Sequence, residues 1–114
     1  MVSTQRLVAG ITAVAGSADV VPVRFSLAQN FPNPFNGETV IRYALRTGGA
    51  VALTIYTLSG QEVRTWQREN AAAGDYAVQW DGRDEKEREV ASGTYLYRTE
   101  TADYLQQKKM LLLR

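Results

Sequence analysis

Residues 51–67 read VALTIYTLSGQEVRTWQ, and this stretch decides the fold class. Its apolar side chains alternate through Val51, Leu53 and Ile55, and this period of two indicates a β-strand with one buried face. A Ser-Gly pair then interrupts the run, and Gly60 can adopt the positive φ of a tight hairpin turn. The stretch therefore predicts a β-hairpin.

The returning strand of this hairpin, residues 61–67, breaks the regular pattern. Val63 and Trp66 are its apolar members, and they would fall on opposite faces of an unbroken strand. An extra residue that kinks the strand would reconcile the two positions. We therefore expect a bulge or a bend in this strand.

The same pattern, short alternating runs of apolar and polar residues separated by turn residues, continues on both sides of the hairpin. Seven candidate strands follow one another at intervals of about ten residues, at 25–27, 39–45, 51–58, 61–67, 75–80, 94–100 and 104–114. No helical stripe competes with them, so the sequence predicts an all-β, immunoglobulin-like Greek-key β-sandwich of about seven antiparallel strands. The turn and core positions that define it are Gly60, Gly74, Trp80, Gly82, Gly93 and Tyr95. The last run is apolar on both faces, which predicts a strand enclosed within the sheet pair.

Composition narrows the possible functions. The 114 residues suffice for one domain, and the net charge of +1 gives no reason to expect nucleic acid as a partner. The chain has no cysteine and no histidine, which excludes disulfides, thiolate metal sites and Ser–His or Cys–His nucleophilic catalysis. We expect no catalysis, no cofactor, no metal and no small-molecule substrate.

The first 24 residues differ in texture from the rest, so we divide the chain into residues 1–24 and a domain at 25–114. Residues 1–17 have the outline of a signal peptide, with Ala13-Val14-Ala15 as a cleavage site. The apolar run is short and diluted by small and polar residues. A linker or the end of an upstream region is the preferred interpretation.

An unusual segment precedes the second candidate strand. Residues 27–36 read LAQNFPNPFN. The two prolines fix φ and push Phe31 and Asn33 toward extended geometry, so the segment is rigid and non-helical. Asn33 and Asn36 are suited to Asx-turns with their own neighbouring backbone. We expect both phenylalanine rings to pin the segment onto the edge of the sandwich.

This segment closely resembles the opening signature of type A C-terminal sorting domains of type IX secretion cargo proteins. Four further stretches resemble that family's motifs, in order and at its spacing: 51–64, 73–84, 90–98 and 108–114. The resemblance spans residues 25–114. The same sandwich also resembles the immunoglobulin-like domain of flagellar hook-capping proteins, so part of the resemblance concerns fold alone.

The resemblance implies a non-catalytic signal that directs a cargo protein, fused upstream, across the outer membrane. Its implied partners are the outer-membrane type IX translocon and a sortase-like protease. The implied location is secreted or cell surface, reached through the periplasm. The recognition candidates are Asn30, Phe31, Pro32, Asn33, Pro34, Phe35, Asn36, Lys108 and Lys109. The loop could instead cap the core, and the two lysines could instead guard an edge strand against aggregation.

Two positions depart from the family pattern. Gly37 stands where the family usually has proline, which loosens the exit from the loop. Lys86-Glu87 stands where the family commonly has Asn-Gly. If that turn requires a positive φ, Glu87 costs about 1 kcal/mol.

The alternative function is a structural or adhesive immunoglobulin-like module, either a hook-cap-like assembly domain or a carbohydrate-binding module. A sugar platform would use Trp66, Tyr76 and Trp80, although alternation makes core packing the better interpretation of Tyr76 and Trp80. A calcium site would use carboxylates of residues 81–85. Loop charges mixed with arginines and lysines are more often simply solvated.

Overall fold

The computed structural model describes residues 25–114, which form seven β-strands and no helix. The strands are β1 (Ser26–Leu27), β2 (Thr39–Leu45), β3 (Gly49–Thr57), β4 (Glu62–Ala71), β5 (Gly74–Trp80), β6 (Gly93–Glu100) and β7 (Leu105–Leu112). One sheet has the order β1-β2-β5 and the other β4-β3-β6-β7, and every strand pair is antiparallel. The prediction of an all-β, immunoglobulin-like sandwich is confirmed.

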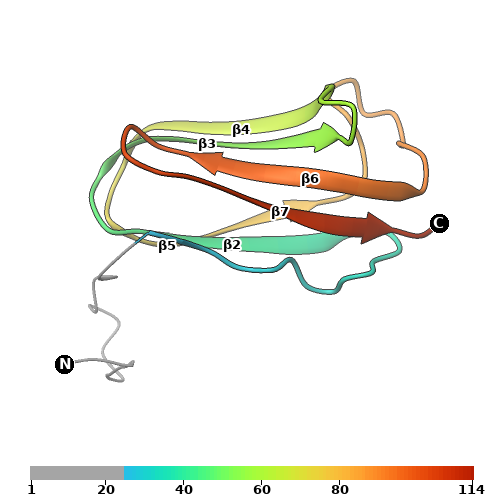
Figure 1. The fold of residues 1–114 in the computed structure, drawn as a ribbon, viewed down its shortest axis with the longest axis horizontal. Coiled ribbons are helices and arrows are strands. Elements are labelled where there is room, and N and C mark those ends of the chain that lie inside the picture. Colours follow the sequence, from blue (N-terminus) through green and yellow to red (C-terminus); the bar gives the residue numbers. More distant parts are fainter. Residues whose placement is uncertain (1–24) are drawn as a thin grey trace.

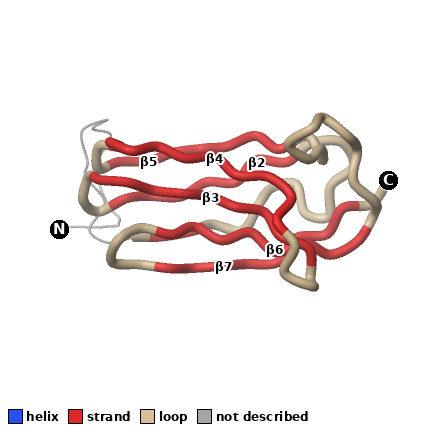
Figure 2. Tube along the Cα trace, turned by 90° about the horizontal axis from the view of Figure 1, so that it is seen from above, coloured by secondary structure: helices blue, strands red, loops and turns tan. Residues whose placement is uncertain are grey.

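The two sheets lie face to face, with β2 and β5 in one layer and the other long strands in the second (Figure 1). The strands follow the long axis of the molecule, and the loops gather at its two ends (Figure 2). The end near the C-terminus carries the loop between β1 and β2, the β3–β4 hairpin and the loop between β5 and β6. The more elaborate loops therefore share one end of the sandwich.

Alternation sets which side chains enter the core. Along β3, Val51, Leu53 and Ile55 are buried, as the period of two predicts. Along β5, Trp80 is buried while Ala77 and Gln79 are exposed. The buried side chains of both sheets form one cluster, so a single core holds the sandwich together.

The β3–β4 hairpin has the predicted turn and the predicted bulge. The Gly60 N–H donates to the Thr57 carbonyl at 3.0 Å, and Gly60 has φ +93°, a value that a residue with a Cβ rarely adopts. Ile55 pairs with Arg64, whereas the next residue of β3 pairs with Glu62. Val63 is the extra residue of this bulge, and its side chain is buried.

Aromatic residues close the core at the end that carries the long loops. The ring of Trp80 is fully buried, and its indole N–H donates to the Arg83 carbonyl at 2.9 Å. Phe35 and Tyr95 pack against this ring, with centroids 5.6 and 5.7 Å away. Trp80 is thus a core residue, in agreement with the alternation of its strand.

The position of β7 corrects one expectation. Apolar residues on both of its faces predicted a strand enclosed within the sheet pair, but β7 is the edge strand of the four-stranded sheet. Met110 and Leu112 face the core, whereas Leu113 is half exposed just beyond the strand. What lies along the edge of β7 is not another strand of the sheet but the loop that precedes β2.

The predicted signal-peptide outline and linker lie in residues 1–24, outside the described residues. In residues 25–114, no helix is long and apolar enough to cross a membrane.

Candidate recognition surface

The loop between β1 and β2, residues 28–38, contains the two prolines and is termed the proline loop. It runs along the sandwich beside β2 and β7 (Figure 1). Both X-Pro peptide bonds in it are cis. Its prolines are exposed, and so is Asn36.

Asn30 ties the proline loop to itself and to β2. Its side chain is buried, and its amide donates to the Thr39 hydroxyl at 3.0 Å and to the Pro32 carbonyl at 3.2 Å. The Thr39 hydroxyl in turn donates to the Pro32 carbonyl at 2.8 Å. A buried amide held on several sides specifies one loop conformation, so Asn30 is a structural residue rather than an exposed contact.

Tyr97 anchors the same loop from the other sheet. Its hydroxyl donates to the Ala28 carbonyl at 2.7 Å and accepts from the Asn30 N–H at 2.9 Å. Burial of the ring disfavours the phenolate and raises the pKa of Tyr97 to about 12. The hydroxyl therefore stays protonated and keeps donating over the physiological pH range.

The proline loop also covers the C-terminal half of the β7 edge. The Asn33 side-chain oxygen accepts from the Leu111 N–H at 2.9 Å, and Gln29 donates to the Lys109 carbonyl at 2.7 Å. Phe35 donates from its N–H to the Leu111 carbonyl at 3.0 Å, and its carbonyl accepts from the Leu113 N–H at 2.9 Å. The expected Asx-turn of Asn33 is replaced by this longer-range bond. Loop and strand thus form one continuous surface.

The two phenylalanines that bracket the prolines face in opposite directions. Phe35 is 2% exposed and packs on Trp80, as expected. Phe31 is 76% exposed, which corrects the expectation that both rings pin the loop. The Phe31 backbone is nevertheless fixed, because its N–H and carbonyl both bond to Val40, at 3.0 and 2.9 Å. The loop therefore displays one aromatic ring on a rigid support.

The two lysines near the C-terminus have different surroundings. Lys108 is the cross-strand partner of Tyr97, whose side chain is in the core. The Lys108 side chain therefore leaves the strand on the inner face of the sheet, and the residue is half-buried. An inward-pointing lysine on an edge strand is a known protection against strand addition. Lys109 is exposed on the opposite face and remains available to a partner.

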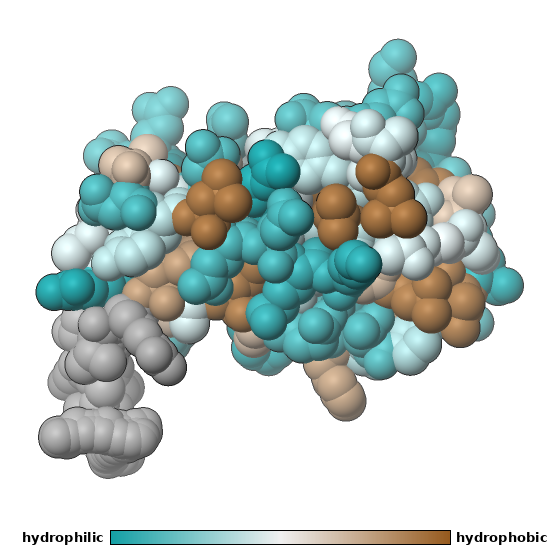
Figure 3. All heavy atoms as spheres, in the orientation of Figure 1, coloured by the Kyte–Doolittle hydropathy of each residue, from teal (hydrophilic) through white to brown (hydrophobic). Residues whose placement is uncertain are grey.

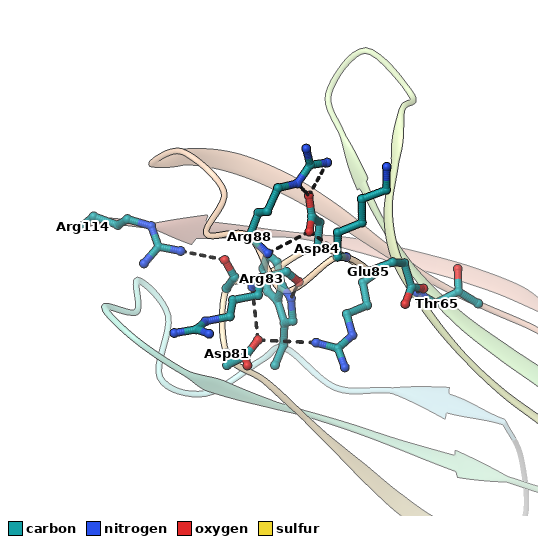
Figure 4. Close-up of polar contacts among 11 residues, drawn as sticks. Thr65, Asp81, Arg83, Asp84, Glu85, Arg88 and Arg114 are labelled. Atoms are coloured by element: carbon teal, nitrogen blue, oxygen red, sulfur yellow. Dashed lines mark hydrogen bonds and ion pairs between the residues drawn. The ribbon is translucent and has the colours of Figure 1, made fainter.

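The loop between β5 and β6, residues 81–92, is termed the charged loop (Figure 4). Asp84 accepts from the Lys86 and Arg88 N–H groups at 2.9 and 3.0 Å, and its carboxylate pairs with the Arg88 guanidinium at 3.0 Å. The backbone hydrogen bond from Arg88 is the main cause that lowers the pKa of Asp84. The Glu85 carboxylate accepts from the Thr65 N–H of β4 at 2.8 Å. These carboxylates already have protein partners, and within residues 25–114 no group of acidic side chains could hold a metal ion.

Arg114 fastens the charged loop to the end of β7. Its guanidinium donates to the carbonyls of Val90 and Gly82, both at 2.7 Å, and lies 3.8 Å from the Glu89 carboxylate. Gly82 has φ +75°, and a Cβ there would lie 2.7 Å from the arginine side chain. Gly82 thus permits both the turn and the close approach of Arg114.

The backbone of the charged loop adopts the positive φ that was considered for the position where Glu87 replaces the glycine of Asn-Gly. Glu87 has φ +63°, the one positive φ of a residue other than glycine in the described range. The conditional prediction is therefore met, and Glu87 is strained at this turn. The other departure, Gly37, has φ +126°, which a proline cannot adopt.

The aromatic side chains proposed for a sugar platform do not form an open surface. Trp80 is buried, and guanidinium groups lie over the rings of Trp66 and Tyr76, 5.2 and 5.0 Å from the centroids. On the face drawn in Figure 3, apolar side chains form separate small patches among hydrophilic ones. Among the large apolar residues in the described part of the chain, Phe31 has the largest exposed fraction.

Fold and loop together define an immunoglobulin-like β-sandwich with a rigid loop clipped to its last strand. A model of the FlgD Ig-like domain family matches residues 35–103, more than half of the chain, and the protein belongs to that family. No curated protein matches the sequence significantly.

Solved structures share the fold at low sequence identity. Dimeric latent PorU from Porphyromonas gingivalis is similar over 89% of this chain and 10% of its own, with a TM-score of 0.62 and 21% identity. FlgD from P. aeruginosa is similar over 67% of each chain, with a TM-score of 0.55 and 22% identity. PorZ is described as an essential bacterial surface component of the type IX secretion system of P. gingivalis. Its match covers 88% of this chain and 13% of the PorZ chain, with a TM-score of 0.53 and 19% identity. The chain thus spans about a tenth of the PorU length.

Proposed function

We propose that this domain is a non-catalytic sorting signal that directs a fused cargo protein across the outer membrane through the type IX secretion system. The five motifs in residues 25–114 that resemble type A sorting domains support this, and the fold shared with PorZ agrees with it. The partners would be the outer-membrane translocon and a sortase-like protease. The cargo would be secreted or held at the cell surface.

One structural observation supports a recognition role for the proline loop within this function, namely the exposed ring of Phe31. Its backbone is bonded to Val40, and its loop is bonded to β7 through Asn33 and Phe35. An aromatic side chain on a fixed backbone loses little conformational entropy when a partner binds it, so it is suited to be a recognition anchor. Packing alone gives no reason for a ring that is 76% exposed.

A reporter fusion tests the proposal. Residues 1–114 are appended to a periplasmic reporter in a bacterium with a functional type IX system. We expect the reporter outside the cell, and its retention in the periplasm would refute the sorting function. A strain without the translocon controls for leakage.

Two variants then test the surface. Phe31→Ala should lower export, whereas Leu58→Ala should not. Leu58 is a matched control because it is also a large apolar residue, is 61% exposed, and lies at the tip of the β3–β4 hairpin. Export of the Phe31 variant at the wild-type level would contradict a role for this ring while leaving the sorting function standing.

A second candidate function is a structural module within an assembly, which the match to the FlgD Ig-like family favours. The reporter assay separates the two functions. A purely structural module would leave the reporter in the periplasm whether or not the translocon is present.

A further inference from the structure

In residues 25–114, three of the four sheet edges are protected against the addition of another strand. The edge of β4 has two register irregularities, and its Thr65 N–H is taken by Glu85. The edge of β7 is covered by the proline loop over residues 109–113 and carries the inward-facing Lys108. β1 is only two residues long. Bulges, inward lysines, covering loops and short strands are the usual protections of edge strands.

The remaining edge, that of β5, has none of these features. β5 pairs with β2 over seven residues without a register shift. It contains no proline and no lysine, and in the part of the chain that the structure describes no segment pairs with its outer side. An open, regular edge exposes unpaired N–H and carbonyl groups that can bind another strand.

The hydrogen bonds of β2 identify which groups face this edge. The Arg42 carbonyl accepts from the Ala28 N–H at 2.9 Å, so the Arg42 backbone faces β1. In an antiparallel sheet, the N–H and carbonyl of one residue point to the same side, and successive residues alternate. Tyr43 therefore faces its register partner Tyr76 on β5. The backbone groups directed at the open edge are those of Asp75, Ala77 and Gln79.

The side chains of β5 suit a partner of the same sequence. If two copies pair antiparallel with Ala77 opposite Ala77, then Asp75 lies opposite Gln79 and Tyr76 lies opposite Val78. The small alanine leaves room at the axis, and no like charges are opposed. Aromatic with β-branched residues are favourable cross-strand pairs, whereas like charges directly opposite each other are unfavourable.

The backbone agrees with the same register. Asp75, Ala77 and Gln79 would be the hydrogen-bonded pairs, and each pair exchanges two N–H···O bonds, about six in all. Tyr76 and Val78 would then form the non-hydrogen-bonded pairs, in which side chains approach more closely. This register meets both requirements, whereas a one-residue slip meets neither.

We propose that the open edge of β5 binds the β5 edge of a second copy, which joins the two three-stranded sheets into one continuous sheet in a two-fold dimer. The pairing is isologous and closes on itself, so it produces dimers and not filaments. It leaves the proline loop free, because that loop lies along β7 in the other sheet. The proposal therefore stands or falls independently of the sorting function.

Sedimentation velocity of the full chain, from about 1 μM to about 1 mM, tests this. We expect a monomer that becomes a dimer as the concentration rises. Ala77→Lys should raise the dissociation constant about fivefold or more, because it places two like charges opposite each other at the axis. Ser26→Lys is the matched control, since Ser26 is exposed on the opposite edge strand of the same sheet, and it should dimerise like the wild type.

Amide hydrogen exchange gives a second readout. In the dimer, exchange of the Asp75, Ala77 and Gln79 amides should slow as concentration rises, while that of other edge amides should not. A wild type that stays monomeric throughout the range, or an Ala77→Lys variant that dimerises as well as the wild type, would overturn the proposal. So would protection of Ala77 that appears only when an extended peptide of another sequence is added.

Discussion

The side-chain oxygen of Asn33 accepts a hydrogen bond from the backbone N–H of Leu111 at 2.9 Å, although 78 positions separate the two residues. Asn33→Ala removes this acceptor and leaves the edge N–H to water. We expect a loss of about 1 kcal/mol in the free energy of unfolding, measured by urea denaturation. Asn33→Asp keeps an oxygen in the same place and should retain most of the stability. Equal stability of the alanine variant and the wild type would show that the loop is held without this bond.

Phe31 and Phe35 should respond in opposite ways to truncation. Phe35→Ala opens a cavity against Trp80 and should cost about 3–5 kcal/mol. Phe31→Ala removes an exposed ring and should change stability by less than about 0.5 kcal/mol. Chemical denaturation of the two variants under the same conditions measures both effects. Comparable losses would mean that the Phe31 ring is packed in solution and is not displayed.

Tyr97 makes stability depend on pH in the alkaline range. Its pKa is raised from 10.0 to about 12 in the folded protein, so below pH 10 the hydroxyl is protonated in both states and its contribution is complete. Between pH 10 and about 12 the unfolded chain loses this proton first, which favours unfolding. We expect stability to fall by about 2–3 kcal/mol over that range. Denaturation at stepped pH measures the slope.

The Tyr97→Phe variant isolates this contribution. It should be less stable at neutral pH by about 1–3 kcal/mol, because the Asn30 N–H loses its acceptor. Its stability should also fall less steeply above pH 10. Part of the decline should remain, since burial also raises the pKa values of Tyr43 and Tyr95. An unchanged slope in the variant would assign the whole decline to those residues.

The strands could be predicted because their signal is local. The alternation in residues 39–45 and 51–58 matches β2 and β3 to within two residues. β4 continues to Ala71, four residues beyond the expected range, because Gly49 of β3 supplies it with a partner there. Residues 68–71 have no alternating pattern, so only tertiary pairing makes them a strand.

The candidate recognition surface was only partly predictable. Its residues were identified by the prolines and by resemblance, and the packing of Phe35 was expected. The exposure of Phe31 was not expected, because a loop has no periodicity that assigns a side chain to a face. The cover that the loop provides for β7 depends on contacts far apart in sequence. No local signal in residues 105–112 distinguishes an edge strand from an enclosed one, apart from Lys108 and Lys109, which were interpreted as a possible guard of an edge strand.

Gly37→Pro tests the first departure from the family pattern. Proline is the usual residue at this place in the type A sorting domains that the chain resembles, yet Gly37 has φ +126°, and proline is restricted to about −65°. The proline loop would therefore have to change its path before β2. We expect a loss of more than about 1 kcal/mol, with Gly37→Ala, which also disfavours positive φ, losing about 1 kcal/mol. A proline variant as stable as the wild type would show that the backbone at position 37 adopts a negative φ in solution.

Glu87→Gly should stabilise the protein, which is unusual for a substitution that removes a side chain. Glu87 has φ +63° and an exposed side chain, so glycine relieves backbone strain and disturbs no packing. The relief of about 1–2 kcal/mol exceeds the entropy that an added glycine costs, and the net gain should be about 0.5–1 kcal/mol. Lys86→Gly is the matched control, because the adjacent Lys86 has no positive φ and gains nothing from glycine. The midpoints of thermal and urea unfolding should therefore rise for Glu87→Gly and fall for Lys86→Gly. A loss of stability in Glu87→Gly would mean that the charged loop does not adopt this turn.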